Sequence, residues 1–299
     1  PRSTPKPSSA ASDVYKRQGL DSSGLPVAWE SKLVSPSLNL HLVKMLGVEE
    51  APNMYLKNGY DFFSVEGMFD PFSMQGSYEI PNLNVDYVQS NLPISLGYWR
   101  SVGMSHNIFA LESAIDEAAS AGENDPLELR RTLLKQKPRA LKVLDKVSEL
   151  SHWGKSIQNG RFRGIGFLFY HGGFQAQVAE VSISNRGKVK VHNVIFVADC
   201  GQVINPSLAR QQVEGSILFG LNATLKSEIN AKNGEIVQSN FDDYPMIKLR
   251  DTPNIKIHFI ESQEFPAGMG EIGTPLICLL YTSDAADEGL GVDLGGRRI

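Results

Sequence analysis

One carboxylate, Glu271, lies in a glycine-rich segment that runs from Pro266 to Pro275 (PAGMGEIGTP). Glycine lets the backbone approach a bulky ligand closely and adopt dihedral angles that other residues avoid. Burial of such an isolated glutamate would raise its pKa toward neutrality, which is the condition for a general base near pH 7. An ordinary surface turn with a solvated glutamate would have the same sequence, because short glycine-rich motifs recur freely.

A second segment whose residues could bind a ligand runs from Gly97 to Gly103 (GYWRSVG). It leads into a region where apolar residues recur at helical spacing. Backbone amides at a turn before a helix, together with Arg100, can hold an anionic or oxo ligand. The alternative is that Trp99 anchors the core while Arg100 is solvated.

A third segment combines Asp199–Gln202 (DCGQ) with residues 205–215 (NPSLARQQVEG). Side-chain amides such as that of Gln212 can donate and accept hydrogen bonds together, as a polar ligand edge requires. Taken alone, these residues also fit a helix cap followed by the first turns of its helix.

The coding sequences of the two ends of the chain are related to each other as the two strands of one DNA segment. A DNA sequence that encodes residues 8–18 gives residues 278–287 when its complementary strand is translated. This segment resembles a sequencing-library transposon adapter. We therefore expect residues 1–18 and 278–299 to be adapter-derived and non-native, and we exclude them from the fold as we would a fusion scar. The natural part is then a fragment, residues 19–277.

Composition excludes several classes of protein. The formal net charge is −4 and no basic block occurs, so nucleic acid is not an expected partner. The two cysteines are Cys200 and the adapter-encoded Cys278, so no disulfide framework and no cysteine-ligated zinc or iron–sulfur site can be built from this chain. No apolar run approaches the roughly 20 residues that a membrane helix needs, so the chain is not expected to span a membrane.

Strand and helix patterns are mixed along the chain, which predicts an α+β fold. Strands are expected where β-branched and apolar residues cluster or alternate, over residues 24–29, 82–89, 164–170, 174–184, 189–198 and 255–259. Helices are expected after Gly103, after the capping residue Asp125 with a break near Pro138, and over residues 207–228. Residues 34–65 look loop-rich. Hairpin turns are predicted at 185–188 and at 233–234, the latter between strands 226–230 and 236–239.

The segments around Arg100, Gln212 and Glu271, in this order, resemble the molybdenum-binding large subunit of the xanthine oxidase family. The branch they resemble most contains isoquinoline 1-oxidoreductase β-subunits and related aldehyde dehydrogenases. The resemblance extends over nearly all of residues 19–277 and is densest over 97–117, 177–181, 199–220, 238–245 and 266–275. It implies the mixed sheets and helices of the molybdopterin-binding domain of molybdenum hydroxylases, here truncated.

The resemblance also implies a cofactor and a reaction. The cofactor is molybdopterin, in its cytosine dinucleotide form, carrying molybdenum that no protein side chain ligates directly. The family inserts oxygen from water into an electron-poor carbon of an aldehyde or an N-heteroaromatic ring, with a glutamate as general base. Glu271 stands at the position of that base, and a partly desolvated carboxylate suits the role.

Other residues carry over from the resemblance one by one. Arg100 and Ser101 match the segment whose backbone faces the metal, while Gln212 matches a pterin-contacting glutamine and Gly270 belongs to the cofactor-binding loop. Trp99 and Val102 match the substrate pocket. Because Val102 stands where xanthine oxidases often place an aromatic residue, a purine substrate is not expected. His106 stands where related chains usually have glutamine, and we expect it to lie behind the site or on the surface.

The domain assignment follows from the same resemblance. Residues 19–95 are expected to form the C-terminal part of the first molybdopterin-binding subdomain, and residues 96–277 the second subdomain, truncated at its C-terminus. Glycine-rich cofactor segments before Gly19 and a helix after Pro275 are expected in the complete protein. This chain alone is therefore not expected to bind cofactor or turn over.

The remaining expectations concern the electron-transfer partner, the location and the alternatives to an enzyme. Cys200 alone cannot ligate a cluster, so electrons are expected to leave through a small subunit with two two-iron two-sulfur clusters, with a cytochrome as a candidate acceptor. Cytoplasmic and periplasmic locations both stay open. The alternatives to an enzyme are an inactive homologue that serves as a scaffold and a binding domain without molybdenum.

Overall fold

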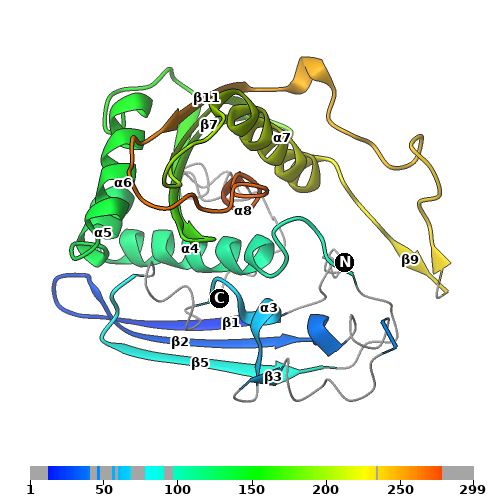
Figure 1. Ribbon diagram of the computed structural model, residues 1–299, viewed down its shortest axis with the longest axis horizontal. Coiled ribbons are helices and arrows are strands. Elements are labelled where there is room, and N and C mark those ends of the chain that lie inside the picture. Colours follow the sequence, from blue (N-terminus) through cyan, green and yellow to red (C-terminus); the bar gives the residue numbers. More distant parts are fainter. Residues whose placement is uncertain are drawn as a thin grey trace.

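The computed structural model describes residues 13–40, 46–47, 56–57, 60–68, 78–90, 97–233 and 235–277. Its main sheet has the strand order β11-β8-β7-β6 (Figure 1). The strands are β6 (Arg161–Tyr170), β7 (Gly173–Ile183), β8 (Val189–Asp199) and β11 (Asn254–Phe259). β6, β7 and β8 are successive antiparallel neighbours, whereas β11 is parallel to β8. These strands are the apolar, β-branched runs that the sequence predicts.

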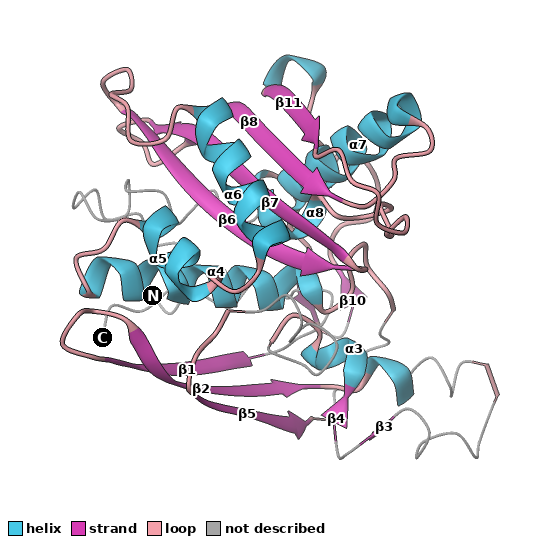
Figure 2. Cartoon of the chain, turned by 60° about the vertical axis from the view of Figure 1, so that its left-hand side comes forward, coloured by secondary structure: helices cyan, strands magenta, loops and turns pink. Residues whose placement is uncertain are grey.

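Helices cover both faces of this sheet (Figures 1 and 2). On one face, α6 (Pro138–Ser151) packs against β7 and β8. On the other face lie α4 (Met104–Ala121), α7 (Pro206–Leu225) and the short α8 (Thr274–Ile277), which contact one another through α8. The predicted α+β fold is therefore confirmed.

The break between α5 (Pro126–Leu133) and α6 forms where the sequence predicts it. The Asp125 carboxylate caps α5 by accepting hydrogen bonds from the backbone N–H groups of Leu127 (2.8 Å) and Glu128 (3.1 Å). Pro126 and Pro138 each occupy the first turn of a helix, where the missing N–H of proline has no cost.

A second sheet lies on the far side of α4 and has the order β1-β2-β5 (Figure 1). Its strands are β1 (Asp13–Leu20), β2 (Pro26–Ser35) and β5 (Asn82–Gln89). β1 is antiparallel to β2, and β2 is parallel to β5. Trp29 of β2 is buried in the same core as Ile108 and Ile115 of α4, so α4 joins the two sheets. β5 has the predicted bounds, whereas β2 continues past the expected end at Trp29.

Part of the segment that is expected to be adapter-derived forms a strand. Asp13 to Gln18 pair with Val34 to Trp29 as part of β1, so this part of the excluded segment forms a strand. The physical reason is that Val14 and Tyr15 have high β propensity and the edge of β2 offers unpaired backbone groups. Residues 1–12 and 278–299 lie outside the described part of the chain.

The remaining elements are short. They are β3 (Leu56–Lys57), β4 (Tyr60–Asp61), α3 (Phe62–Val65), β9 (Ala231–Lys232), β10 (Glu235–Ile236) and the 3-10 turn η1 (Leu249–Asp251). Much of the expected loop region 34–65 lies outside the described residues. The hairpin around Asn233 forms, but the expected strand 226–230 does not, because Lys226 caps α7 and pairing begins at Ala231.

A buried ionic cluster ties α4 to α5 and to the main sheet. Arg130 and Glu112 are both fully buried, with Arg130 Nη2 3.0 Å from Glu112 Oε2, and Arg130 Nη1 lies 2.6 Å from Asp116 Oδ1. Glu112 also accepts hydrogen bonds from the Tyr78 hydroxyl (2.7 Å) and from the backbone N–H of Phe167 (2.8 Å). The charges are thus compensated inside the core, as buried ions require.

Candidate active site

The Glu271 loop, residues 266–275, follows β11. It passes the end of β8 near Cys200 and the end of β6 near His171. Its backbone is fixed by the N–H of Ala267, which donates to the Cys200 carbonyl (2.9 Å), and the N–H of Gly268, which donates to the His171 carbonyl (3.2 Å). Gly201 has a φ of +69° and lies so close to the loop that an added Cβ would be 2.2 Å from the Phe265 oxygen. The loop therefore has one defined path over the sheet.

The carboxylate of Glu271 receives three contacts. The backbone N–H of Ser101 donates to Oε2 (2.7 Å), and the Tyr170 hydroxyl donates to Oε1 (2.7 Å). His171 Nε2 lies 3.2 Å from the same Oε1. The Glu271 side chain is 25 % exposed, and that of His171 is 43 % exposed. The site is thus a partly exposed carboxylate held by donors from two distant segments.

The pKa of Glu271 is lowered rather than raised, because its hydrogen bonds outweigh the effect of partial burial. The hydrogen bond from His171, followed by those from Tyr170 and the Ser101 amide, lowers the pKa of Glu271 to about 2, against the opposing effect of partial burial. Hydrogen bonds to the charged form of a carboxylate favour ionisation. Glu271 is therefore held as a carboxylate at neutral pH.

The turn before α4 is strained where it meets Glu271. Ser101 and Val102 have φ angles of 73° and 44°, a region that a β-branched residue such as valine rarely adopts. Ser101 is fully buried, and its hydroxyl donates to the Glu271 carbonyl (3.0 Å). Backbone strain of this kind persists only where the surroundings impose it, and it concentrates at functional sites.

The Gly270 carbonyl is a shared acceptor for two of the predicted site residues. Gln212 Nε2 donates to it (2.6 Å), and Arg100 donates from Nε (3.2 Å) and from Nη2. Arg100 thus has a protein partner instead of being simply solvated. The structure therefore brings together Arg100, Ser101, Gln212, Gly270 and Glu271, which are distant in the sequence.

The two expected substrate-pocket residues have other contacts. The Trp99 ring packs against Phe219 of α7, with 4.8 Å between ring centroids. Val102 is half-buried, and its backbone N–H donates to the Trp99 carbonyl (2.8 Å). Among the described residues, neither side chain makes a hydrogen bond, ion pair or ring contact with Glu271.

His106 and most of residues 199–215 contribute to the fold rather than to the contacts of Glu271. Burial of the ring lowers the pKa of His106 to about 4, so the imidazole is neutral at pH 7, and the residue is half-buried. The side chain of Asn205 caps α7 by accepting from the backbone N–H of Leu208 (3.0 Å), which matches the helix-cap interpretation. Gln212 is on an exposed part of the same helix, so one segment provides both the cap and a site residue.

Tyr170 and His171 were missed as site residues by reasoning from the sequence. They lie at the tip of the β6–β7 hairpin, where Tyr170 pairs with Gly173. The signal that could have found them is His171-Gly172 between two predicted strands, a two-residue hairpin turn. The sequence did not indicate that this turn reaches Glu271.

Buried amides near this hairpin have unmet hydrogen-bonding capacity. Both polar atoms of the Gln175 side chain and Oε1 of Gln177 are buried and have no partner among the described residues. Side chains alternate along a strand, so Gln175 and Gln177 share the sheet face of Gly173 and of its pair Tyr170. Amides donate and accept together, so this face suits a polar ring ligand, and the residues present fit a pterin-type cofactor.

Close packing behind Glu271 makes a prediction about two glycines. An added Cβ at Gly273 would lie 2.4 Å from Ser216 Oγ and 2.8 Å from Ile217 Cγ1, whereas one at Gly270 would meet only Gln212 Nε2 at 3.7 Å. We expect Gly273→Ala to lower the free energy of unfolding by about 1–3 kcal/mol through overpacking. Gly270→Ala is the matched control, and chemical denaturation of the full-length protein measures both. Equal effects of the two changes would contradict this packing argument.

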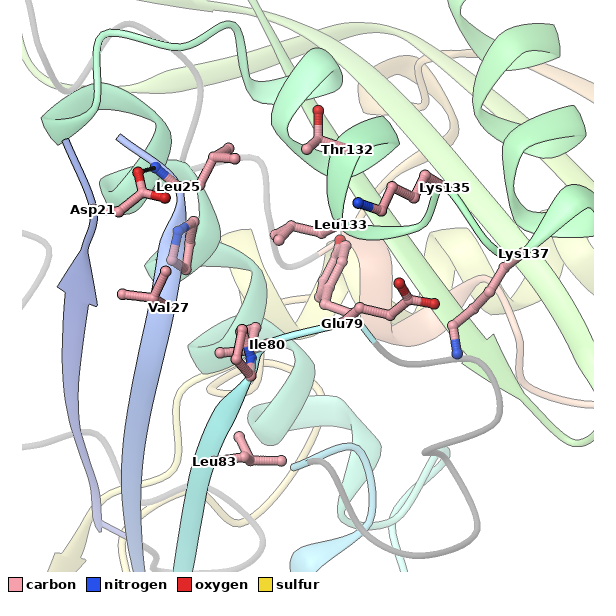
Figure 3. Close-up of a pocket in the computed structure, with 13 residues that line it drawn as sticks. Asp21, Leu25, Val27, Glu79, Ile80, Leu83, Thr132, Leu133, Lys135 and Lys137 are labelled. Carbon is pink, nitrogen blue, oxygen red and sulfur yellow. Dashed lines mark hydrogen bonds between the residues drawn. The ribbon is translucent and has the colours of Figure 1, made fainter. Parts of the chain in front are cut away.

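A cavity of about 570 Å³ lies elsewhere, between the start of β5 and the α5–α6 connection (Figure 3). Apolar side chains such as Leu25, Ile80 and Leu133 line it, with Lys135 and Lys137 at one side. None of the predicted site residues lines this cavity, so it is separate from the candidate active site.

Three further observations concern metal ligands, membrane helices and the free cysteine. The described ranges contain no group of three or more His, Cys, Asp or Glu side chains placed to hold a metal ion. In the same ranges, no helix is both long and apolar enough to cross a bilayer. Cys200 is a buried free thiol whose pKa is raised to about 11, chiefly by burial, so it is not a reactive thiolate.

Comparison with known proteins identifies relatives. A family model described as the molybdopterin cofactor-binding domain matches residues 113–253, a range that ends before β11 and the Glu271 loop. The beta chain of isoquinoline 1-oxidoreductase from Brevundimonas diminuta is 28% identical over 219 residues, 71% of this chain and 28% of that protein. A nicotinate dehydrogenase subunit from Pseudomonas putida is 27% identical over 67% of this chain and 19% of its own length. The chain thus spans less than a third of these relatives.

Solved structures show the same fold. Quinoline 2-oxidoreductase from Pseudomonas putida 86 superposes with a TM-score of 0.69 at 14% identity, covering 90% of this chain and 58% of that chain. The Cu,Mo-CO dehydrogenase superposes with a TM-score of 0.67 at 11% identity, with the same coverages of 90% and 58%. At such identities the likeness concerns the fold alone.

Proposed function

We propose that this chain is part of the catalytic subunit of a molybdenum hydroxylase, because residues 113–253 match the molybdopterin cofactor-binding domain family and the chain is similar to a subunit of isoquinoline 1-oxidoreductase. The proposed reaction is oxidative hydroxylation of an aldehyde or N-heteroaromatic carbon with oxygen from water. The observation that carries the proposal is the convergence of Arg100, Ser101 and Gln212 on Gly270 and Glu271. A lone solvated glutamate in a surface turn would have no such set of partners.

Glu271 is proposed as the general base. The Ser101 amide orients Oε2, and the Tyr170 hydroxyl orients Oε1, so the carboxylate is fixed before a substrate arrives. A carboxylate oxygen has two lone pairs, and Oε2 uses one of them among the contacts of the described residues. We infer that Oε2 accepts the proton removed during the reaction. Fixed orientation of a base contributes to rate because no reorganisation is needed.

The residues proposed to hold the cofactor have free hydrogen-bonding groups. Within the described part of the chain, Arg100 uses Nε and Nη2 on the Gly270 carbonyl, which leaves Nη1 as a donor, while Gln212 keeps Oε1 as an acceptor. The unpartnered amides of Gln175 and Gln177 are further candidates on the sheet face. When bound, molybdopterin with molybdenum would supply the oxidising centre. We propose its cytosine dinucleotide form, with Ser101 and Gly270 contributing backbone contacts.

Substrate, partner and domain assignments extend the same proposal. Trp99 and Val102 are proposed to border the substrate pocket, and the small side chain of Val102 suits an aldehyde or heterocycle better than a purine clamp. Cys200 is buried and is the only cysteine in the described residues, so we propose that electrons leave through a two-iron two-sulfur subunit, with a cytochrome as further acceptor. Residues 19–95 and 96–277 are proposed as parts of two cofactor-binding subdomains.

The test uses the full-length protein produced together with its iron–sulfur partner. We expect about one molybdenum per complex and dye-linked oxidation of either aldehydes or quinoline-type heterocycles, and the two substrate sets decide between the classes. A folded complex that lacks molybdenum would contradict the proposal and support the scaffold alternative. The described chain expressed alone is the matched comparison, and we expect it to lack both metal and activity.

A further inference from the structure

We propose that Gly215 is the point at which the molybdopterin cofactor comes closest to helix α7, and that its missing side chain leaves room for the flat ring of the pterin. The inference rests on the proposed function, in which this chain binds that cofactor. Gly215 lies near the middle of α7 (Pro206–Leu225), where glycine is unfavourable for the helix itself. Its presence there therefore calls for a reason outside the helix.

Packing within the chain does not supply that reason. Leaving aside the helix backbone and the two neighbouring residues, no atom of the described residues lies within 4 Å of a Cβ built at Gly215, and the residue is exposed. Gly220, further along α7, is different. A Cβ there would overlap the Ile277 side chain and lie 2.8 Å from the Thr274 carbonyl oxygen. Gly220 thus allows α7 to pack on α8, whereas Gly215 faces open space.

The open position lies between two contacts that α7 makes with the candidate active site. Gly215 shares one face of the helix with Gln212 and Phe219, which precede and follow it by about one turn. Gln212 Nε2 donates to the Gly270 carbonyl (2.6 Å). On the other side, Arg100 Cζ lies 5.7 Å from the centroid of the Phe219 ring. The exposed backbone of Gly215 is therefore bordered by the two segments that meet at Glu271.

The groups around this position suit a pterin. Within the described residues, Arg100 Nη1 and Gln212 Oε1 make no hydrogen bond, so a cationic donor and an amide acceptor are available to an anionic group and a polar ring edge. The family model for a molybdopterin cofactor-binding domain matches residues 113–253, a range that includes all of α7. A flat ring can lie close to a helix backbone only where no side chain intervenes, and Gly215 supplies that opening.

A segment of the full-length subunit is the competing occupant of this space. Such a segment would be in place whether or not cofactor is bound, so a larger side chain at position 215 would destabilise the cofactor-free protein. If the cofactor is the occupant, the space is empty in the cofactor-free protein and a side chain is tolerated there. Alanine then stabilises the helix relative to glycine. The two occupants therefore predict opposite changes in the stability of the cofactor-free protein.

The first measurement is the molybdenum and pterin content of Gly215→Ala and Gly215→Leu in the full-length protein purified with its iron–sulfur partner. We expect Gly215→Leu to lower both contents at least about tenfold, because the added side chain overlaps the ring, and Gly215→Ala to lower them less. Glu214→Leu is the matched control. It places the same side chain on the exposed surface of α7 but points about 100° away from Gly215, so we expect the wild-type content.

The second measurement is the denaturation midpoint of the same variants as cofactor-free full-length protein, produced in a host that makes no molybdopterin. We expect Gly215→Ala to raise the midpoint and Gly215→Leu not to lower it. Unchanged molybdenum content in Gly215→Leu, an equal loss in Glu214→Leu, or a lowered midpoint of cofactor-free Gly215→Leu would overturn the role of Gly215 alone. A folded wild-type complex without molybdenum would instead overturn the proposed function, and this inference with it.

Discussion

Glu271→Gln in the full-length complex is expected to lower kcat by about a thousandfold, because loss of a positioned general base typically costs 10²–10⁴ in rate. The amide has the shape of the carboxylate and keeps an oxygen that can accept from the Ser101 amide, so the loop should keep its path. It cannot take up a proton in the reaction. Steady-state kinetics with the best aldehyde or heterocycle, together with molybdenum content, measure the effect.

The matched control for this change is Glu261→Gln. Glu261 lies in the same connection after β11 but is exposed, and we expect its replacement to leave kcat within about twofold, because the effect of an exposed charge is screened by salt. Metal content should be unchanged in both variants. If Glu271→Gln loses molybdenum, the residue holds the cofactor site together. If it keeps both metal and full activity, Glu271 is not the base.

Arg130→Met is expected to lower the free energy of unfolding by about 3–5 kcal/mol, because it leaves the buried charge of Glu112 without its partner. Arg130 and Glu112 are both fully buried, and Asp116 would lose its contact as well. Chemical denaturation of the full-length protein measures the loss. The neighbouring Arg131→Met is the control: Arg131 pairs with exposed Glu128 and Asp145, so we expect a loss of at most about 1 kcal/mol.

The loss in Arg130→Met should depend on pH. Burial raises the pKa of Glu112 even with Arg130 present, and removal of the arginine can only raise it further. A carboxyl whose pKa is higher in the folded than in the unfolded state stabilises the fold below its unfolded pKa, and this stability is lost as pH rises through the folded pKa. The variant should therefore be destabilised less near pH 4 than near pH 7. Combining it with Glu112→Gln should recover part of the loss at pH 7, and no recovery would contradict the charge argument.

Local elements could be predicted because their signals lie within a few residues. The Asp125–Pro126 start of α5 depends on a carboxylate and a proline at fixed positions, and it forms with the expected hydrogen bonds. The hairpin at residues 185–188 closes with the Gly187 N–H donating to the Ser184 carbonyl (2.8 Å). Such contacts depend on neighbours in sequence, so composition and spacing suffice. Where an element depends on a distant partner, as β1 depends on the edge of β2, local signals did not predict it.

The sequence by itself determined the identity of the segments that meet at the site, since Arg100, Gln212 and Glu271 each lie in a recognisable motif. Only the tertiary structure decided what surrounds the carboxylate. Tyr170 and His171 lie about a hundred residues from Glu271 in the chain, and they reach it because the β6–β7 hairpin and the turn before α4 pack against one loop. The pKa of Glu271 follows from the hydrogen-bond donors and the burial around its carboxylate, so only the tertiary structure could decide the direction of the shift.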